Sequence, residues 1–75
     1  MYINMRMVAL NKLKIGVKAR ISHVGKNAHL LAERGIYVGL EFEIFQRNGD
    51  SCILRVAGGK ITIRTDLRGI KCQQE

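Results

Sequence analysis

The sequence predicts an all-β protein, a small SH3-like β-barrel with one short α-helix inserted between the first and second strands. Three observations support this fold class. Several short segments alternate apolar and polar residues, as half-buried strands do. Two pairs of turn residues, Asn48-Gly49 and Gly58-Gly59, separate the later segments. Isoleucine, leucine and valine dominate the apolar residues, whereas only two Phe, two Tyr and no Trp are present.

Length and composition indicate one globular domain. With 75 residues the chain has no room for a second core, and its 47% of hydrophobic residues exclude a disordered chain. Two cysteines, Cys52 and Cys72, are too few for a disulfide-stapled secreted scaffold. No segment resembles a signal peptide, and no apolar run approaches the roughly 18 residues of a membrane span. We therefore expect a cytoplasmic protein with reduced thiols.

The first elements are a short extension, a turn and a strand. Residues 1–9 show no clean periodicity, so we expect an N-terminal extension there, followed by a domain over residues 10–73. Leu10 and Leu13 bracket a single turn that packs on the body of the protein. From Val17 the residues alternate, and this predicts a strand whose apolar side faces the core. A bulge near Ser22-His23 would return Val24 to that side.

The helix is expected over residues 26–34. Asn27 is the best N-cap residue available. Gly35 is predicted to end the helix at C′ with a positive φ, and Ile36 to pack back on the last turn as in a Schellman motif. Leu31 and Ile36 are therefore expected in the core.

The second half of the chain predicts a meander of strands. The second strand runs from Glu41 to Gln46, and Phe45 interrupts its alternation. A strand after the Asn-Gly turn places Cys52 and Leu54 inward, and a strand over residues 60–64 follows the Gly-Gly turn. A single helical turn at residues 65–68 and a short fifth strand around residues 70–72 complete the barrel, whose closure leaves few unpaired edges.

Four short motifs occur in order between about Ala9 and Lys71. They comprise Leu10, Leu13 and Gly16; Ala19, Arg20 and Ile21; Leu31, Gly35, Ile36 and Gly39; and Ile61, Thr62, Ile63, Arg64 and Ile70. In this order and at these spacings they resemble the FeoA family, small cytosolic components of bacterial ferrous iron transport systems. Two positions differ from the family pattern: Val38 replaces the usual proline before the second glycine, and Arg34 replaces an apolar residue.

The residues predict no enzyme and no resident cofactor. No set of Ser, His and Asp, no nucleophile–base pair and no phosphate-binding glycine loop occurs in the sequence. His23 and His29 are weak candidates for divalent metal binding, but their spacing matches no common ligand motif. The simpler interpretation, which we favour, is that both histidines lie on the surface and both cysteines are small buried hydrophobes.

The resemblance implies a module that binds another protein, the FeoB-type transporter, a membrane protein with a cytosolic GTPase domain. Such a protein would lie at the inner membrane through its partner. Exposed apolar groups ringed by cations are suited to docking. The candidates for this surface are Leu30, Arg34, Tyr37, Phe45 and Arg47.

The net charge of +7 keeps an alternative open, namely an RNA- or DNA-binding barrel. Its basic surface would comprise Lys18, Arg20, Arg55, Arg64 and Lys71. Few exposed aromatic residues are available for base stacking, so we do not favour this alternative. A homo-oligomer formed through exposed strand edges also remains open.

Overall fold

The computed structural model describes residues 7–64 and 69–75 of the chain. These residues form six strands, one α-helix and two short 3-10 helices. In chain order they are β1 (Met7–Ala9), η1 (Leu10–Lys12), β2 (Lys18–His23), η2 (Gly25–Asn27), α1 (Ala28–Glu33), β3 (Glu41–Asn48), β4 (Ser51–Val56), β5 (Gly59–Arg64) and β6 (Lys71–Gln74). The helical turn predicted at residues 65–68 lies outside the described residues.

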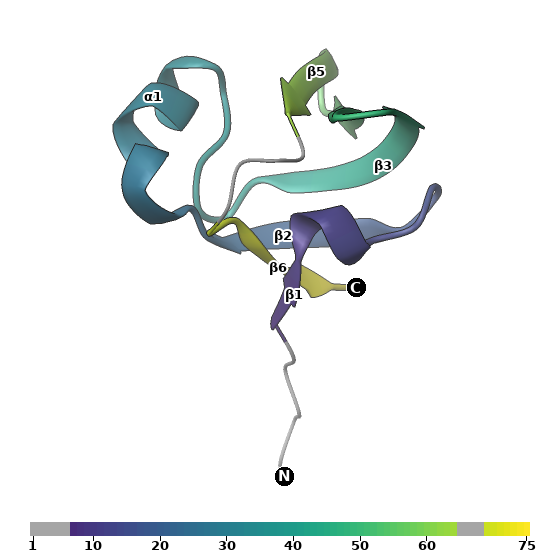
Figure 1. The fold of residues 1–75 in the computed structure, drawn as a ribbon, viewed down its shortest axis with the longest axis horizontal. Helices are drawn as coiled ribbons and strands as arrows, with labels where there is room; N and C mark the ends of the chain where they lie inside the picture. The colour runs from purple at the N-terminus through teal and green to yellow at the C-terminus, as the bar shows by residue number, and fades with distance from the viewer. Residues whose placement is uncertain (1–6, 65–68) are drawn as a thin grey trace, which may run out of the picture.

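The strands form one antiparallel sheet in the order β1-β6-β2-β3-β4-β5. The sheet curls, so that β3 and β5 lie above β2 and β6 in Figure 1, while α1 covers one end. The helix lies between β2 and β3, which are the first and second strands predicted from the sequence. The predicted small β-barrel with one inserted helix is thus confirmed.

Strand β1 was not predicted, because its three residues lie inside the segment interpreted as an extension. Met7, Val8 and Ala9 pair with Gln73, Cys72 and Lys71 of β6. A strand this short carries no recognisable alternation, and its pairing depends on a strand more than 60 positions later. The predicted extension is therefore corrected from Met7 onward, where the chain forms an edge strand.

The predicted bulge in the first long strand is confirmed. The register of β2 against β6 shifts between Ile21 and His23. Ile21 is buried before the shift, and Val24 packs against the core after it. The extra residue therefore restores the apolar side of the chain to the interior.

Both predicted hairpins are present, although the central turn residues are Gly49-Asp50 and Ala57-Gly58, each one position from the predicted pairs Asn48-Gly49 and Gly58-Gly59. Asn48 pairs with Ser51, so Gly49 and Asp50 are the central residues of the first turn. Gly49 has a φ of +56°, the conformation that a type II′ turn requires at its first central position. Strand β3 also contains a register shift between Ile44 and Gln46, which explains why Phe45 departs from the alternation.

Helix α1 ends in the predicted Schellman motif. Gly35 has a φ of +88°, and its amide donates to the carbonyl of Ala32, while the Ile36 amide donates to the carbonyl of Leu31 at 2.9 Å. At the other end, Asn27 occupies the N-cap position, but its side chain makes no capping hydrogen bond. The preceding 3-10 helix η2 leads the chain into α1 instead.

The core is mainly aliphatic, with Phe42 among its members, and lies inside the curled sheet. Leu31 and Ile36 are buried there as expected, and so are Cys52 and Cys72, which have no exposed surface. Leu10 and Leu13 also join this core, which confirms the packing of the predicted turn. Only Leu31 anchors α1 in the core, because the rest of the helix is exposed.

Candidate docking surface

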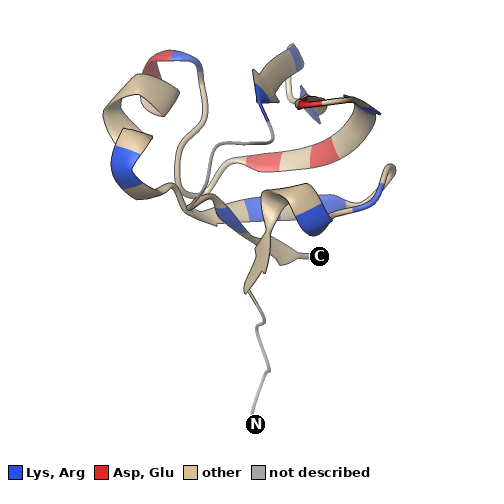
Figure 2. Ribbon diagram, in the orientation of Figure 1, with Lys and Arg blue, Asp and Glu red and all other residues tan. Residues whose placement is uncertain are grey.

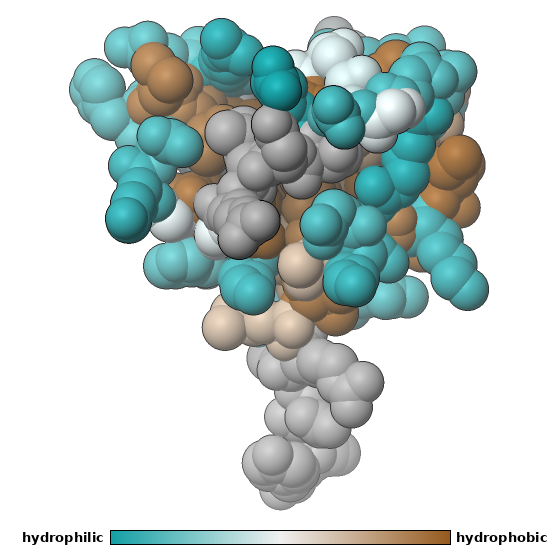
Figure 3. Space-filling view, viewed as in Figure 1, coloured by the Kyte–Doolittle hydropathy of each residue, from teal (hydrophilic) through white to brown (hydrophobic). Residues whose placement is uncertain are grey.

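The exposed face of α1 carries a hollow of about 180 Å³. Its lining comes from two elements: Asn27, Leu30, Leu31 and Arg34 from the helix and its ends, and Arg64 from the end of β5. Leu30 is 56% exposed, so a large apolar side chain stands at the surface beside the hollow. Figure 3 shows hydrophobic surface over this end of the molecule, surrounded by hydrophilic side chains. The structure therefore brings two predicted docking residues, Leu30 and Arg34, together.

A second hollow, of about 430 Å³, lies beyond the end of the helix. Tyr37, 52% exposed, lines it together with Val56 and Ile61. Val38, the residue after Tyr37, is 59% exposed. Gly35 and Ile61 meet between the helix and β5, where a Cβ on Gly35 would lie 3.3 Å from Cδ1 of Ile61. We call Leu30, Arg34, Tyr37 and Val38 the helix-end surface.

Phe45 lies on a different part of the surface. Its ring is half-buried and is covered by two cations: Cζ of Arg55 lies 4.8 Å and Nζ of Lys60 3.9 Å from the ring centroid. These contacts hold the aromatic ring within the β3–β5 part of the sheet. Phe45 is thus separate from the helix-end surface and has intramolecular partners.

Arg47 is also engaged within the chain. Its guanidinium donates hydrogen bonds to the carbonyl oxygens of Leu10, at 3.0 Å, and of Leu13. These carbonyls belong to the 3-10 turn η1 and the residue that follows it. Arg47 therefore ties β3 to η1, and we leave it out of the proposed docking surface.

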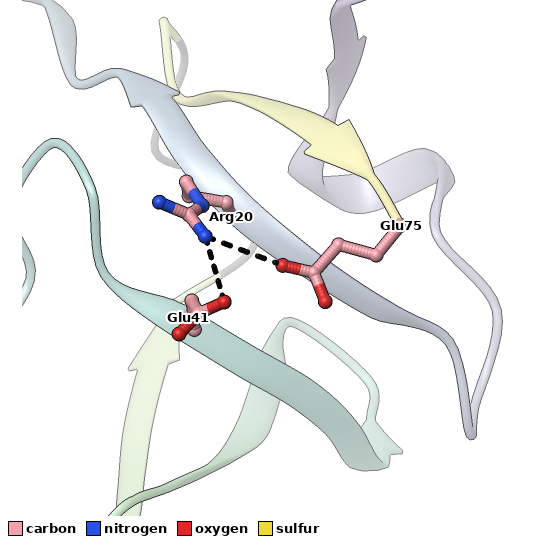
Figure 4. Close-up of polar contacts among 3 residues, drawn as sticks. All are labelled: Arg20, Glu41 and Glu75. Atoms are coloured by element: carbon pink, nitrogen blue, oxygen red, sulfur yellow. Dashed lines mark hydrogen bonds and ion pairs between the residues drawn. The ribbon is translucent and has the colours of Figure 1, made fainter.

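The basic residues do not form an uninterrupted stripe. Lys18 and Arg55 both pair in register with Glu43, from opposite sides of β3. Arg20 lies opposite Glu41, donates to it at 2.8 Å, and also lies 3.8 Å from Glu75 (Figure 4). Figure 2 shows these acidic positions of β3 beside basic positions of β2. Three of the five predicted basic residues thus face carboxylates.

Arg64 and Lys71, the other two basic residues, lie in different strands. Arg64 ends β5 and lines the hollow beside α1, whereas Lys71 begins β6, next to β2. The predicted basic residues therefore lie on separate parts of the described structure and not along one stripe.

Comparison with known families settles the relationship of the chain. A family model described as the FeoA domain matches residues 8–67. This chain belongs to the FeoA family. It is therefore a small accessory protein associated with ferrous iron transport. A solved structure of an iron uptake regulatory protein, FeoA, is similar over 95% of this chain and 100% of that one, with a TM-score of 0.79 and 18% sequence identity. Comparison with curated proteins gave no significant match.

The predicted metal candidates lie on different elements of the FeoA fold. His23 ends β2, and His29 lies on α1, where its Nε2 is 3.6 Å from an oxygen of Glu33. Within residues 7–64 and 69–75, no group of three or more His, Cys, Asp or Glu side chains could hold a metal ion. Burial raises the pKa of the Cys72 thiol to about 11, and proximity to Cys52 adds to this shift.

Sequence reasoning did not assign Val38 or Ile61 to the docking surface and did not predict the second hollow. Val38 was recognised as a departure from the FeoA pattern, and its large apolar side chain between a tyrosine and a glycine was the available signal. The approach of Ile61 to Gly35 joins positions 26 residues apart. Such a contact follows from the curl of the sheet, which no local pattern in the sequence reports.

Proposed function

We propose that this FeoA-family chain is an accessory protein that docks on the cytosolic, GTPase-containing part of a FeoB-type ferrous iron transporter. Through this partner it would lie at the inner face of the membrane. No helix among the described residues is long and apolar enough to cross a membrane. By binding to the transporter, the chain would modulate iron uptake or the assembly of the transporter.

The exposed apolar side chains of the helix-end surface carry this proposal. Leu30, Tyr37 and Val38 are each more than half exposed, although the chain has a complete aliphatic core. A protein surface that displays large apolar groups beside cations is suited to a small interface with apolar anchors and a polar rim. Family membership identifies the transport system in which the partner is sought.

The test is a pull-down with the cytosolic domain of a FeoB-type transporter, comparing the wild type with Leu30→Asp. A charge at an anchor position should weaken binding by about tenfold or more, the size of a hot-spot effect. Ile15→Asp is a matched control, because Ile15 is 61% exposed and its loop lies at the opposite end of the molecule from α1 (Figure 1). No binding by the wild type, or equal loss in both variants, would contradict the proposal.

The nucleic-acid alternative makes a different prediction. Binding led by phosphate contacts should fall steeply between about 50 and 200 mM salt in a mobility-shift experiment. Lys18, Arg20 and Arg55 lie opposite glutamates in the sheet, and Arg20 is ion-paired with Glu41, so the structure gives this alternative little support. Sedimentation at two protein concentrations tests for a homo-oligomer in the same preparations.

A further inference from the structure

The hollow beside α1 combines an apolar lining with arginines. Its helical residues, Asn27, Leu30, Leu31 and Arg34, follow the i, i+3, i+4, i+7 spacing of one helix face. Arg64 approaches the same hollow from β5. None of the described residues that line this hollow is acidic. The hollow therefore offers contact to hydrocarbon and to a negative charge at once.

Arg34 distinguishes this place from the basic residues of the sheet. Lys18, Arg20 and Arg55 each lie opposite a glutamate in the strand register, and Arg20 is ion-paired with Glu41. Arg34 lies outside the strands and makes no ion pair with the described residues. Its neighbour Glu33 lies beside His29 instead. Arg64 has contacts elsewhere in the chain, so Arg34 is the cation on which the inference depends. A guanidinium at the edge of a partly apolar hollow is suited to a carboxylate, which it can bind in a fork of two hydrogen bonds.

We propose that this hollow takes an acidic segment of the partner protein, with an aliphatic side chain against Leu30 and Leu31 and an adjacent carboxylate paired with Arg34. This inference rests on the proposed docking function and specifies the chemistry of the partner. The net charge of +7 favours an acidic partner, and the leucines favour a protein segment over a phosphate backbone. A partner carrying acidic and aliphatic residues in alternation would satisfy both parts of the hollow.

The first test measures binding of the transporter's cytosolic domain to Arg34→Glu, Arg34→Lys and the control Lys14→Glu. Lys14 is exposed and belongs to the loop between η1 and β2, and this loop lies at the opposite end of the molecule from α1 (Figure 1). Arg34→Glu should weaken binding by about tenfold, Arg34→Lys by less, and Lys14→Glu by less than about threefold. Equal weakening by Arg34→Glu and Lys14→Glu would overturn the inference, since only net charge would then matter.

The second test separates this inference from the proposed function. The probe is a fluorescently labelled peptide of alternating leucine and glutamate, compared with the same peptide carrying glutamine in place of glutamate. The acidic peptide should bind the wild type about fivefold or more tightly than Arg34→Glu, whereas the glutamine peptide should not distinguish the two. If the transporter domain does not bind, the proposed docking function is contradicted, but the assignment of this hollow to an acidic segment is not. An acidic peptide that does not bind, or that binds Arg34→Glu equally well, would overturn the assignment of this hollow.

Discussion

Gly35 meets two separate requirements at one position. Its φ of +88° ends α1 through the Schellman hydrogen bonds, and its missing side chain leaves room for Ile61 of β5. The first requirement is local and could be recognised in the sequence. The second depends on the sheet bringing β5 against the end of the helix. A single residue thus fixes both the end of the helix and its position on the barrel.

Replacing Gly35 by alanine should destabilise the protein by about 1–2 kcal/mol, because an L residue at positive φ is strained. The new Cβ would also press on Ile61. Gly16→Ala is the matched control, since Gly16 has a φ of +90° with nothing within 4 Å of its added Cβ. Urea unfolding of the two variants measures the difference. Equal stability of Gly35→Ala and the wild type would contradict this account.

Single residues also show where sequence reasoning reached its limit. Asn27 was correctly placed at the start of α1, but whether an N-cap side chain makes its hydrogen bond depends on the entering chain, here a 3-10 turn. Arg47 was interpreted as part of a polar rim, and its partners are the carbonyls of Leu10 and Leu13, more than 30 positions earlier. Local patterns do not report such distant hydrogen bonds.

Among the helices and strands, the sequence predicted the features that depend on residues close together in the chain. The bulge in β2, both hairpin turns and the helix end follow from alternation and from glycine positions, and all are present. Strand β1 was missed because its pairing with β6 involves residues at opposite ends of the sequence. For the same reason Leu30, Arg34 and Tyr37 were named individually as docking candidates, but the two hollows that they line were not foreseen.

The turn η1 should depend on Arg47 of β3. Arg47→Met removes both hydrogen bonds to the turn and should lower the free energy of unfolding by about 1.5–3 kcal/mol, the usual range for bonds to a charged group. Arg47→Lys should recover part of this loss. Urea unfolding measures the free energy of unfolding of Arg47→Met and Arg47→Lys. Arg55→Met is the control, because Arg55 is an exposed arginine that contacts Phe45. A loss no larger than that of the control would contradict a structural role for Arg47.

Two buried thiols make the stability of the folded protein depend on pH. Burial raises the pKa of Cys72 from 9.0 to about 11, and burial also raises the pKa of Cys52. The unfolded chain therefore loses these protons at lower pH than the folded chain does. The resulting stability is fully present below about pH 9 and is lost as pH rises toward about 11. The folded protein should be more stable at pH 8 than at pH 10 by an amount that depends on these thiols.

Urea unfolding of the wild type and Cys72→Ala at the two pH values tests this expectation. Cys72→Ala loses packing in the core at both pH values. Its stability should nevertheless fall less than that of the wild type between pH 8 and pH 10, because one buried titrating group is gone. Neither thiol should react with a thiol reagent while the protein is folded. An identical pH dependence in both proteins would count against the raised pKa of Cys72.

The order of strands in the sheet determines which strands can pair first as the chain folds. β2 lies between β3, which follows the helix, and β6, whose Cys72 is 51 positions beyond its partner Ile21. Strands β2, β3, β4 and β5 can pair in sequence order as they are synthesised, whereas β1 and the outer edge of β2 must wait for β6. Until β6 arrives, the outer edge of β2 is unpaired, and there the nascent chain on the ribosome would be exposed to proteases and to pairing with other chains.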